Sequence, residues 1–207
     1  MAQIFRFLYD QTRCMGCNAC QMACKDKNDL EAGLFFRRVE TLRYEEGGRE
    51  IFAHYSGACS HCREAACVKA CPVGAMVHME DGSVRQADGL CIGCGACTWA
   101  CPYGAVSLSH KLGVARKCDS CIDLRRAGKA PACVDACPTH CLTFEEVEEM
   151  DGTEDQALKE IGTKRAEAGV GQAAARRRYG EPRLPFLPDP AVTKPALRIR
   201  KKGEDLG

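Results

Sequence analysis

The chain has 207 residues and a mass of 22.6 kDa, enough for one large domain or two small ones. Its 29 basic and 28 acidic residues nearly cancel, so net charge does not indicate a nucleic acid or another polyanion as a partner. Only 6% of the residues are aromatic and the mean hydropathy is −0.28, so apolar side chains alone would form a thin core. The 17 cysteines, about 8% of the chain, therefore need an explanation of their own.

Residues 1–13 lack the apolar stretch and the small-residue cleavage site of a secretory signal. No apolar run is long enough to cross a bilayer, so the sequence predicts no direct membrane insertion. We therefore expect the chain to fold in the cytoplasm without a signal of its own. Any contact with a membrane is expected to come through a partner.

Two predicted β elements precede most of the cysteines. The apolar run from Ile4 to Tyr9 predicts a first strand. Two β-like runs between Phe35 and Tyr55, on either side of residues 45–48, predict a β-hairpin. After Phe144 the sequence turns charged and alanine-rich, and then proline-rich. We expect residues 151–207 to form a helical segment and an extended tail that docks on a partner, with a solvated tail as the alternative.

Sixteen of the cysteines form four similar motifs. The motifs are Cys14, Cys17, Cys20 and Cys24; Cys59, Cys62, Cys67 and Cys71; Cys91, Cys94, Cys97 and Cys101; and Cys118, Cys121, Cys133 and Cys137. The third, C-x2-C-x2-C-x3-C-P, is the bacterial ferredoxin run, in which three thiolates hold one 4Fe–4S cube and the fourth reaches a neighbouring cube. The long gap in the fourth motif, residues 122–132, is expected to be a surface loop.

Other uses of the cysteines fit this spacing less well. Structural zinc usually takes two pairs of ligands separated by a longer loop, whereas three cysteines within seven residues are too crowded for that pattern. A disulfide framework is typical of small secreted domains, and the chain shows no secretory signal. No motif has a replaced cysteine that would favour a three-iron cluster. The sequence thus predicts four 4Fe–4S clusters, which would change the formal charge from +1 to about −7 and leave lysines and arginines to offset buried cluster charge.

Three residues near the motifs invite separate predictions. Cys141, the seventeenth cysteine, stands where two other repeats have alanine, and we expect a small buried side chain rather than a ligand. His61 lies between two cysteines of the second motif; it is expected to be passive, with a hydrogen bond to a cluster sulfur as the alternative. Trp99 lies inside the third motif and is expected to pack against the cubes rather than to relay electrons.

The order of the motifs resembles the iron–sulfur subunit of the dimethyl sulfoxide reductase family of molybdopterin oxidoreductases. The resemblance extends from Phe7 to about Lys202. It rests on C-x2-C-x2-C-x3-C-K-D at Cys14 to Asp26, F-R-R at Phe36 to Arg38, S-H-C at Ser60 to Cys62, D-G at Asp81-Gly82, C-P-Y-G-A at Cys101 to Ala105, K-C-D-x-C at Lys117 to Cys121 and T-K-P at Thr193 to Pro195.

The spacing by itself supports an exchange of fourth ligands between motifs; the specific pairing is implied only by the resemblance. It pairs the first motif with the fourth and the second with the third. The implied cubes are held by Cys14, Cys17, Cys20 and Cys137; by Cys118, Cys121, Cys133 and Cys24; by Cys59, Cys62, Cys67 and Cys101; and by Cys91, Cys94, Cys97 and Cys71.

The fold class expected from this pairing is α+β, with two ferredoxin-like two-cluster modules, one inserted in the other. Residues 1–56 and 105–150 are the outer module with the hairpin insertion, and residues 57–104 are the inner module. No catalytic residues are expected, because no nucleotide fingerprint and no nucleophile–base set stands out.

The resemblance implies a non-catalytic subunit that relays single electrons in anaerobic respiration. Its expected partners are a large molybdopterin subunit with molybdenum or tungsten and an integral-membrane anchor that oxidises quinol. Such a complex is peripheral to the membrane and is exported with a twin-arginine partner, or it stays in the cytoplasm. The alternative is a free polyferredoxin-like carrier for a hydrogenase or a formate-linked enzyme, and a stoichiometric large subunit in a pull-down would distinguish the two.

Overall fold

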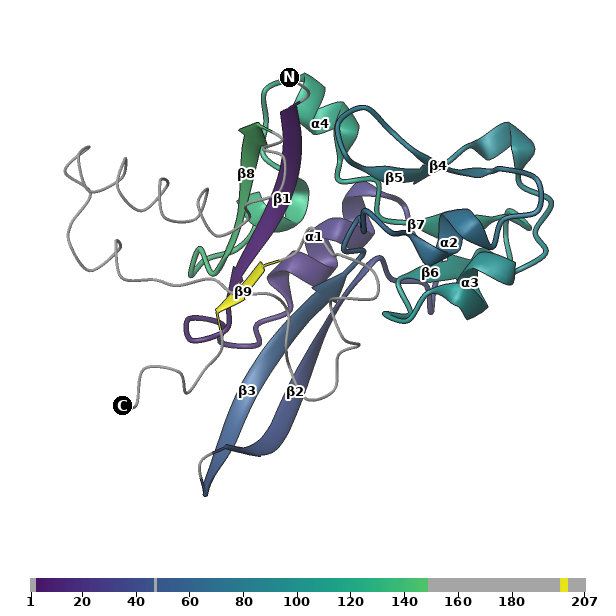
Figure 1. Ribbon diagram of the computed structural model, residues 1–207. Helices are drawn as coiled ribbons and strands as arrows, with labels where there is room; N and C mark the ends of the chain where they lie inside the picture. The colour runs from purple at the N-terminus through teal and green to yellow at the C-terminus, as the bar shows by residue number, and fades with distance from the viewer. Residues whose placement is uncertain (1–2, 47, 149–197, 201–207) are drawn as a thin grey trace.

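The computed structural model describes residues 3–46, 48–148 and 198–200, and its elements are short (Figure 1). The helices are α1 (Ala19–Lys27), α2 (Ala66–Lys69), α3 (Ala96–Ala100), α4 (Ile122–Arg126) and α5 (Ala132–Asp135), with a 3-10 turn η1 (Asp88–Leu90). The strands are β1 (Gln3–Asp10), β2 (Arg37–Glu46), β3 (Arg49–Ala58), β4 (Met76–His78), β5 (Val84–Gln86), β6 (Val106–Leu108), β7 (Ala115–Lys117), β8 (Leu142–Glu148) and β9 (Arg198–Arg200).

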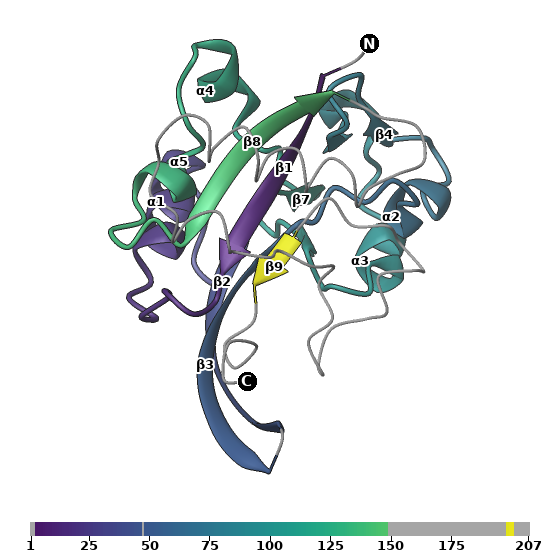
Figure 2. The ribbon, with the colours of Figure 1, turned by 60° about the vertical axis from the view of Figure 1, so that its left-hand side comes forward.

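Strand β1 is the centre of a three-stranded sheet. It pairs antiparallel with β8, where Phe7 lies opposite Phe144, and parallel with β9 (Figure 2). This confirms the predicted first strand. Ile199 of β9 is buried in the same core as Tyr9, so this piece of the basic tail packs on its own chain. The rest of the predicted helical segment and tail lies outside the described residues.

The predicted β-hairpin is confirmed as β2 and β3, which pair from Arg37 opposite Ala58 to Glu46 opposite Arg49. Both ribbon views show it projecting from the body of the molecule (Figures 1 and 2). Glu45 and Arg49 near its tip are exposed, whereas Ala53 and Tyr55 nearer its base are buried. The hairpin is therefore anchored at one end only, and that end lies beside the cysteine motifs.

The helices of the motifs pack in two pairs. Helix α1 of the first motif contacts α5 of the fourth, and α2 of the second contacts α3 of the third. The small hairpins β4–β5 and β6–β7 accompany the second pair, and their buried Val84, Val106 and Ala115 join Cys67 and Cys97 in one apolar cluster. The mixed α/β character is thus as expected, and segments far apart in sequence are joined through their cysteine helices.

The gap in the fourth motif is not a loop throughout, as we had expected. Its first half is helix α4, which begins after Cys121, and the surface loop is confined to the exposed residues up to 130. Asp123 in the first turn and Arg125 in the last turn both complement the helix dipole. This charge order is a helix signal that the sequence contained.

Each cluster loop has a left-handed residue immediately before its second cysteine. These residues are Gly16, His61, Gly93 and Ser120, with φ of 69°, 43°, 69° and 63°. The shared backbone turn explains why glycine recurs here, because a side chain at positive φ is strained. At Gly93 space is limiting as well, because an added Cβ would lie 2.3 Å from the carbonyl oxygen of Gly113.

We predict that Gly93→Ala selectively weakens the third motif. Strain and the backbone clash together should lower the free energy of unfolding by about 2–4 kcal/mol. Gly33→Ala is the matched control, since Gly33 has φ of 81° and no neighbour within 4 Å of the added Cβ. Thermal unfolding and iron content measure the effect, and equal losses in both variants would contradict the role of the clash.

Candidate metal centres

The sixteen motif cysteines lie in four sets of four. We name them set A (Cys14, Cys17, Cys20 and Cys137), set B (Cys118, Cys121, Cys133 and Cys24), set C (Cys59, Cys62, Cys67 and Cys101) and set D (Cys91, Cys94, Cys97 and Cys71). Each set takes three cysteines from one motif and one from another. The names of the sets follow the pairing that the family resemblance implies, which stays a prediction for the ligands themselves.

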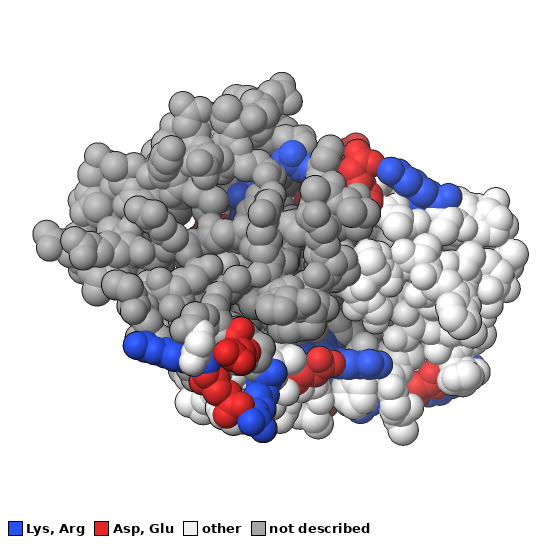
Figure 3. Space-filling model, turned by 60° about the horizontal axis from the view of Figure 1, so that its bottom comes forward, with Lys and Arg blue, Asp and Glu red and all other residues white. Residues whose placement is uncertain are grey.

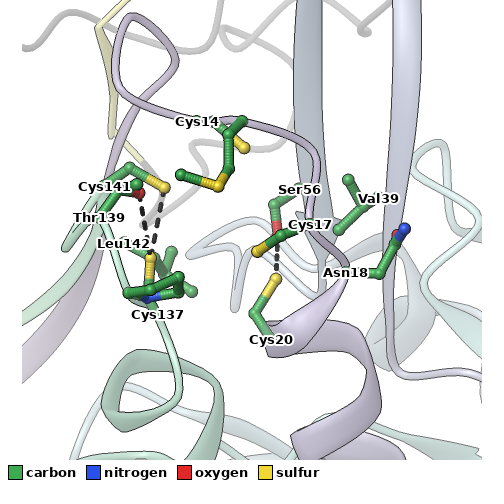
Figure 4. Close-up of a pocket in the computed structure, with 12 residues that line it drawn as sticks. Cys14, Cys17, Asn18, Cys20, Val39, Ser56, Cys137, Thr139, Cys141 and Leu142 are labelled. Carbon is green, nitrogen blue, oxygen red and sulfur yellow. Dashed lines mark hydrogen bonds between the residues drawn. The ribbon is translucent and has the colours of Figure 1, made fainter.

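Two of the sets line common pockets. All four cysteines of set A line one pocket, together with Ser56 of β3 and Cys141 (Figure 4). Figure 4 shows them arriving from the loop before α1, from α1 itself and from the segment after α5. All four cysteines of set C line a second pocket, which Ala105 and Val106 complete.

The other two sets are defined by thiols that act on one another electrostatically. In set B, burial raises the pKa of Cys24 to about 12, and the neighbouring Cys133 and Cys121 contribute to the rise. In set D, burial raises the pKa of Cys97, and nearby Cys91, Cys71 and Cys94 add to the rise. Thiolates that are buried so close together repel one another. A bound metal cluster supplies the positive charge of its irons, which stabilises the thiolate form.

Backbone N–H groups point at the sulfurs, as the tight loops require. His61 N–H donates to Cys59 Sγ over 3.5 Å, and Ser120 N–H donates to Cys118 Sγ over 3.4 Å. The Gly16 N–H makes the equivalent bond to Cys14. The left-handed residue of each of these loops therefore has a second role, because its turn directs the donor at the first thiol.

The sets lie in the order A, B, C and D. Cys20 of set A is a neighbour of Cys133 of set B, and Cys118 of set B is a neighbour of Cys59 of set C. Sets C and D share one apolar cluster and the α2–α3 contact. The result is a continuous row of four thiol sets through the molecule.

Two buried cations lie where adjacent sets meet. Arg37, only 3% exposed, donates to the carbonyl and hydroxyl oxygens of Ser56 over 2.9 and 3.0 Å. Burial would lower its pKa, but Cys133, Cys20 and other thiolates of sets A and B outweigh this and raise it.

The second buried cation is Lys117, which is 5% exposed and bonds to the carbonyl oxygens of Val84 and Cys118. Burial raises the pKa of both Cys118 of set B and Cys67 of set C, and the Lys117 charge opposes that rise at each thiol. The charge of Arg37 thus lies between sets A and B, and the charge of Lys117 lies between sets B and C.

The donor sets fit 4Fe–4S cubes. Each thiolate of a cube binds a different iron, so four sulfurs surround a volume and do not converge on one point. Among residues 3–46, 48–148 and 198–200, no three Cys, His, Asp or Glu side chains converge on a single metal-ion position. The Arg37 Nε is buried without a hydrogen-bond partner between sets A and B, and a cluster sulfide is a suitable acceptor for it.

A polar network fastens the inner loops to the sheet. Asp81 accepts hydrogen bonds from Ser83 and, over 2.9 Å, from Arg125, and these bonds outweigh burial and lower the pKa of its carboxyl to about 2. The Arg125 guanidinium stacks over the rings of Phe5 and Phe144 at 4.3 and 5.1 Å. Asp81-Gly82 was noted in the sequence only as part of the resemblance, and its contacts give it a structural role.

His61 contributes to this junction. Its Nδ1 accepts a hydrogen bond from Val84 N–H over 3.1 Å, and its ring lies edge-on to Phe5 with centroids 5.1 Å apart. Burial lowers its pKa far below the usual value, and the positive charge of Lys117 adds to this. The ring is therefore neutral and joins the second motif to β5 and β1.

Trp99 does not pack against the clusters, which corrects our expectation. It is 91% exposed on α3. Cys97 and Cys101 are four residues apart and share one helix face, so the residue between them, two positions from each, projects to the opposite side. The same position in the other repeats is held by Met22, Lys69 and Asp135, all exposed.

The seventeenth cysteine is buried, as expected. Cys141 is 5% exposed, and its sulfur lies 3.4 Å from Cys137 Sγ. It is also hydrogen-bonded to Cys14, and that bond lowers the pKa of Cys14 and raises its own. It thus lies inside set A, which the sequence did not reveal because Cys14 is far away along the chain.

Comparison with known proteins supports iron–sulfur clusters as the bound metal. The family model for a 4Fe-4S dicluster domain matches residues 51–147, and that for a 4Fe-4S binding domain matches residues 11–27. One relative is a chain of the anaerobic dimethyl sulfoxide reductase of Escherichia coli (strain K12). The two sequences are 37% identical over 100% of this protein and 96% of the relative.

The protein belongs to the iron–sulfur subunits of the dimethyl sulfoxide reductase family. A thiosulfate reductase electron transfer subunit of Salmonella typhi is 39% identical over 83% of this protein and 90% of the relative. A sulfite dehydrogenase subunit of Allochromatium vinosum is 36% identical over 74% and 73%. As a member of this family, the iron–sulfur subunit carries 4Fe–4S clusters and transfers electrons without being the catalytic chain. None of its described helices has the length and apolar character needed to cross a bilayer.

We predict that Arg37→Met lowers the reduction potentials of two clusters of the iron–sulfur subunit. Removing a buried positive charge disfavours the added electron by about 1 kcal/mol per cluster, or roughly 40 mV. Arg38→Met is the control, because Arg38 is the exposed neighbour. Arg37→Lys should restore most of the shift. Redox titration followed by electron paramagnetic resonance checks this, and unchanged potentials in Arg37→Met would contradict it.

Proposed function

We propose that the iron–sulfur subunit relays single electrons through four 4Fe–4S clusters held by sets A, B, C and D. The relay connects a large molybdopterin catalytic subunit with a second redox partner, an integral-membrane anchor that oxidises quinol. Each cluster changes by one electron, and its potential depends on nearby charge, on hydrogen bonds to sulfur and on exposure. The chain's own residues supply the thiolate ligands, the N–H donors and the buried cations.

The exposure of the four sets is the observation that carries this proposal. Among the described residues the only exposed cysteines are Cys17 and Cys94, which belong to the two end sets, A and D. The cysteines of the inner sets B and C are buried or half-buried. Electrons therefore have access to the row at its two ends, as a relay between two partners requires.

The outward position of each motif helix supports the same assignment. It is apolar in the two motifs that give three thiols to an end set, where Met22 is 56% and Trp99 91% exposed. It is charged in the two motifs that give three thiols to an inner set, where it is Lys69 or Asp135. The residue after the first cysteine repeats the pattern, because Met15 and Ile92 of the end sets are also exposed. Exposed apolar residues concentrated at the two ends favour two protein partners.

The end at set D suits the membrane anchor. Leu90, Ile92 and Trp99 are 55%, 65% and 91% exposed, and Val73 lies beside Cys71 with 39% exposed. Figure 3 shows a broad face almost free of Lys, Arg, Asp and Glu on the side where Figure 1 places α2, α3 and β6. An uncharged face with an exposed tryptophan matches a partner at the membrane–water interface. The iron–sulfur subunit would then be peripheral to the membrane.

The contacts between the motif helices support the proposed arrangement of one module nested in the other, with one change to the end of the inner module. The contact between α1 and α5 joins the two parts of the outer module, which are residues 1–56 and the segment that ends near residue 150. Because Val106 and Ala115 pack in the cluster of Cys67 and Cys97, we place the end of the inner module at Lys117, not at residue 104. Residues 151–207 are kept as a third region, except that β9 joins the sheet of the outer module.

We predict that Cys24→Ser perturbs the cluster built on Cys118, Cys121 and Cys133, although Cys24 belongs to the first motif. Serine is a poorer iron ligand than thiolate, so that cluster should be lost or shifted while the other three persist. Cys141→Ser is the matched control, since it changes a buried cysteine that is not one of the sixteen proposed ligands. Iron content and electron paramagnetic resonance are the measurements, and a defect confined to the cluster of Cys14 would contradict the assignment.

We predict that Trp99→Lys blocks electron exchange at one end without removing a cluster. The variant gives set D the residue type that set C carries at this position, which disfavours docking of an apolar partner. Asp135→Lys is the control, because Asp135 holds the same outward position in the motif that gives three thiols to inner set B, and it should leave transfer intact. In the purified complex, quinol-dependent reduction of the clusters should fall at least about tenfold, roughly 1.4 kcal/mol. Equal rates in both variants would remove the support for an exit at set D.

A further inference from the structure

The seventeenth cysteine lies within set A although that set already holds four thiols. Cys141 Sγ is 3.4 Å from Cys137 Sγ and is hydrogen-bonded to Cys14 as well. Figure 4 shows it on the same side of the pocket as Cys137, with Thr139 beside both. The Thr139 hydroxyl is 3.7 Å from Cys137 Sγ. Cys141 therefore contacts two proposed ligands from different motifs at once.

Each repeat has a residue four places after its last cysteine, as Cys141 is in the fourth repeat, so the other three repeats serve as internal comparisons. The residue four places after the last cysteine donates to that cysteine's sulfur in each of the other three. Ala75 N–H bonds to Cys71 Sγ over 3.1 Å, Ala105 N–H bonds to Cys101 Sγ over 3.4 Å, and Asn28 Nδ2 lies 3.7 Å from Cys24 Sγ.

The fourth repeat keeps this backbone donor and adds a thiol to it. Cys141 N–H bonds to Cys137, as the two alanines do in their repeats, and its S–H is a further donor at the same sulfur. The direction of the S–H bond follows from the chemistry of ligation. A cysteine bound to iron is a thiolate and only accepts hydrogen bonds, so the proton between Cys141 and Cys137 or Cys14 belongs to Cys141.

We propose that Cys141 is a positioning residue whose thiol donates a hydrogen bond to a ligand sulfur of set A and thereby raises the reduction potential of that cluster. This inference rests on the proposed function. A hydrogen bond to a ligand sulfur stabilises the more negative, reduced cluster more than the oxidised one. The cluster at one end of the row thus receives both a backbone and a side-chain donor from this position, whereas each of the other three repeats supplies one donor. The additional donor makes this cluster a better electron acceptor.

The test uses the purified complex and two substitutions. Cys141→Ala installs the residue that the second and third repeats carry, so folding and cluster loading should be retained. We expect the potential of one cluster to shift to a more negative value and the other three to stay unchanged. Cys141→Ser keeps a side-chain donor and should restore at least half of the shift. Redox titration with electron paramagnetic resonance gives the potentials, and iron and sulfide analysis gives the cluster count.

The outcomes separate this inference from the function on which it rests. Wild-type protein with far fewer than sixteen irons would overturn the four-cluster relay and the inference together. Full loading with unchanged potentials in Cys141→Ala would overturn the inference alone. Equal shifts in Cys141→Ala and Cys141→Ser would also overturn it, because the donor would then be irrelevant. Loss of a cluster in Cys141→Ala would identify Cys141 as a ligand, which contradicts its role as a donor.

Discussion

The fold depends on one constraint: the fourth cysteine of each motif lies in a set built by another motif. Cys24 and Cys137 tie the first and fourth motifs together, and Cys71 and Cys101 tie the second and third. Helices as short as α2 and α5, with four residues each, are too short to be stable alone. Their positions are fixed because each contains a thiol of one set and is followed two residues later by a thiol of the neighbouring set. The thin apolar core of Phe5, Phe7 and Tyr9 supports this framework.

Charge is the second condition that the structure has to satisfy. Thiolates and clusters concentrate negative charge in an interior of low dielectric, where an isolated charge is costly. The chain answers with N–H donors at the sulfurs and with Arg37 and Lys117 buried at the boundaries between sets. The net charge of the sequence, which is close to zero, does not indicate this arrangement. It counts all charged residues alike, whereas the two cations beside the thiol sets are distinguished only by their burial.

The four repeats differ mainly where they meet the surroundings. Their inward positions are cysteine, and the alanine before each fourth cysteine is shared, whereas the outward position varies among Met22, Lys69, Trp99 and Asp135. Aligning the four motifs on their cysteines indicates which residue faces outward, because helix geometry alone decides it. Our expectation for Trp99 failed because it considered the residue's size and neglected its place between two cysteines four apart.

The sequence by itself determined the chemistry: the spacing of the sixteen cysteines predicted 4Fe–4S clusters, and local patterns predicted β1 and the β2–β3 hairpin. These are short-range properties, set by the reach of a few residues. Only the tertiary structure decided which sets adjoin, which cations lie between them, which cysteines are exposed and that Cys141 meets Cys14. Some of those contacts join residues more than a hundred positions apart. No local pattern specifies them, because they arise only when the chain folds around its thiols.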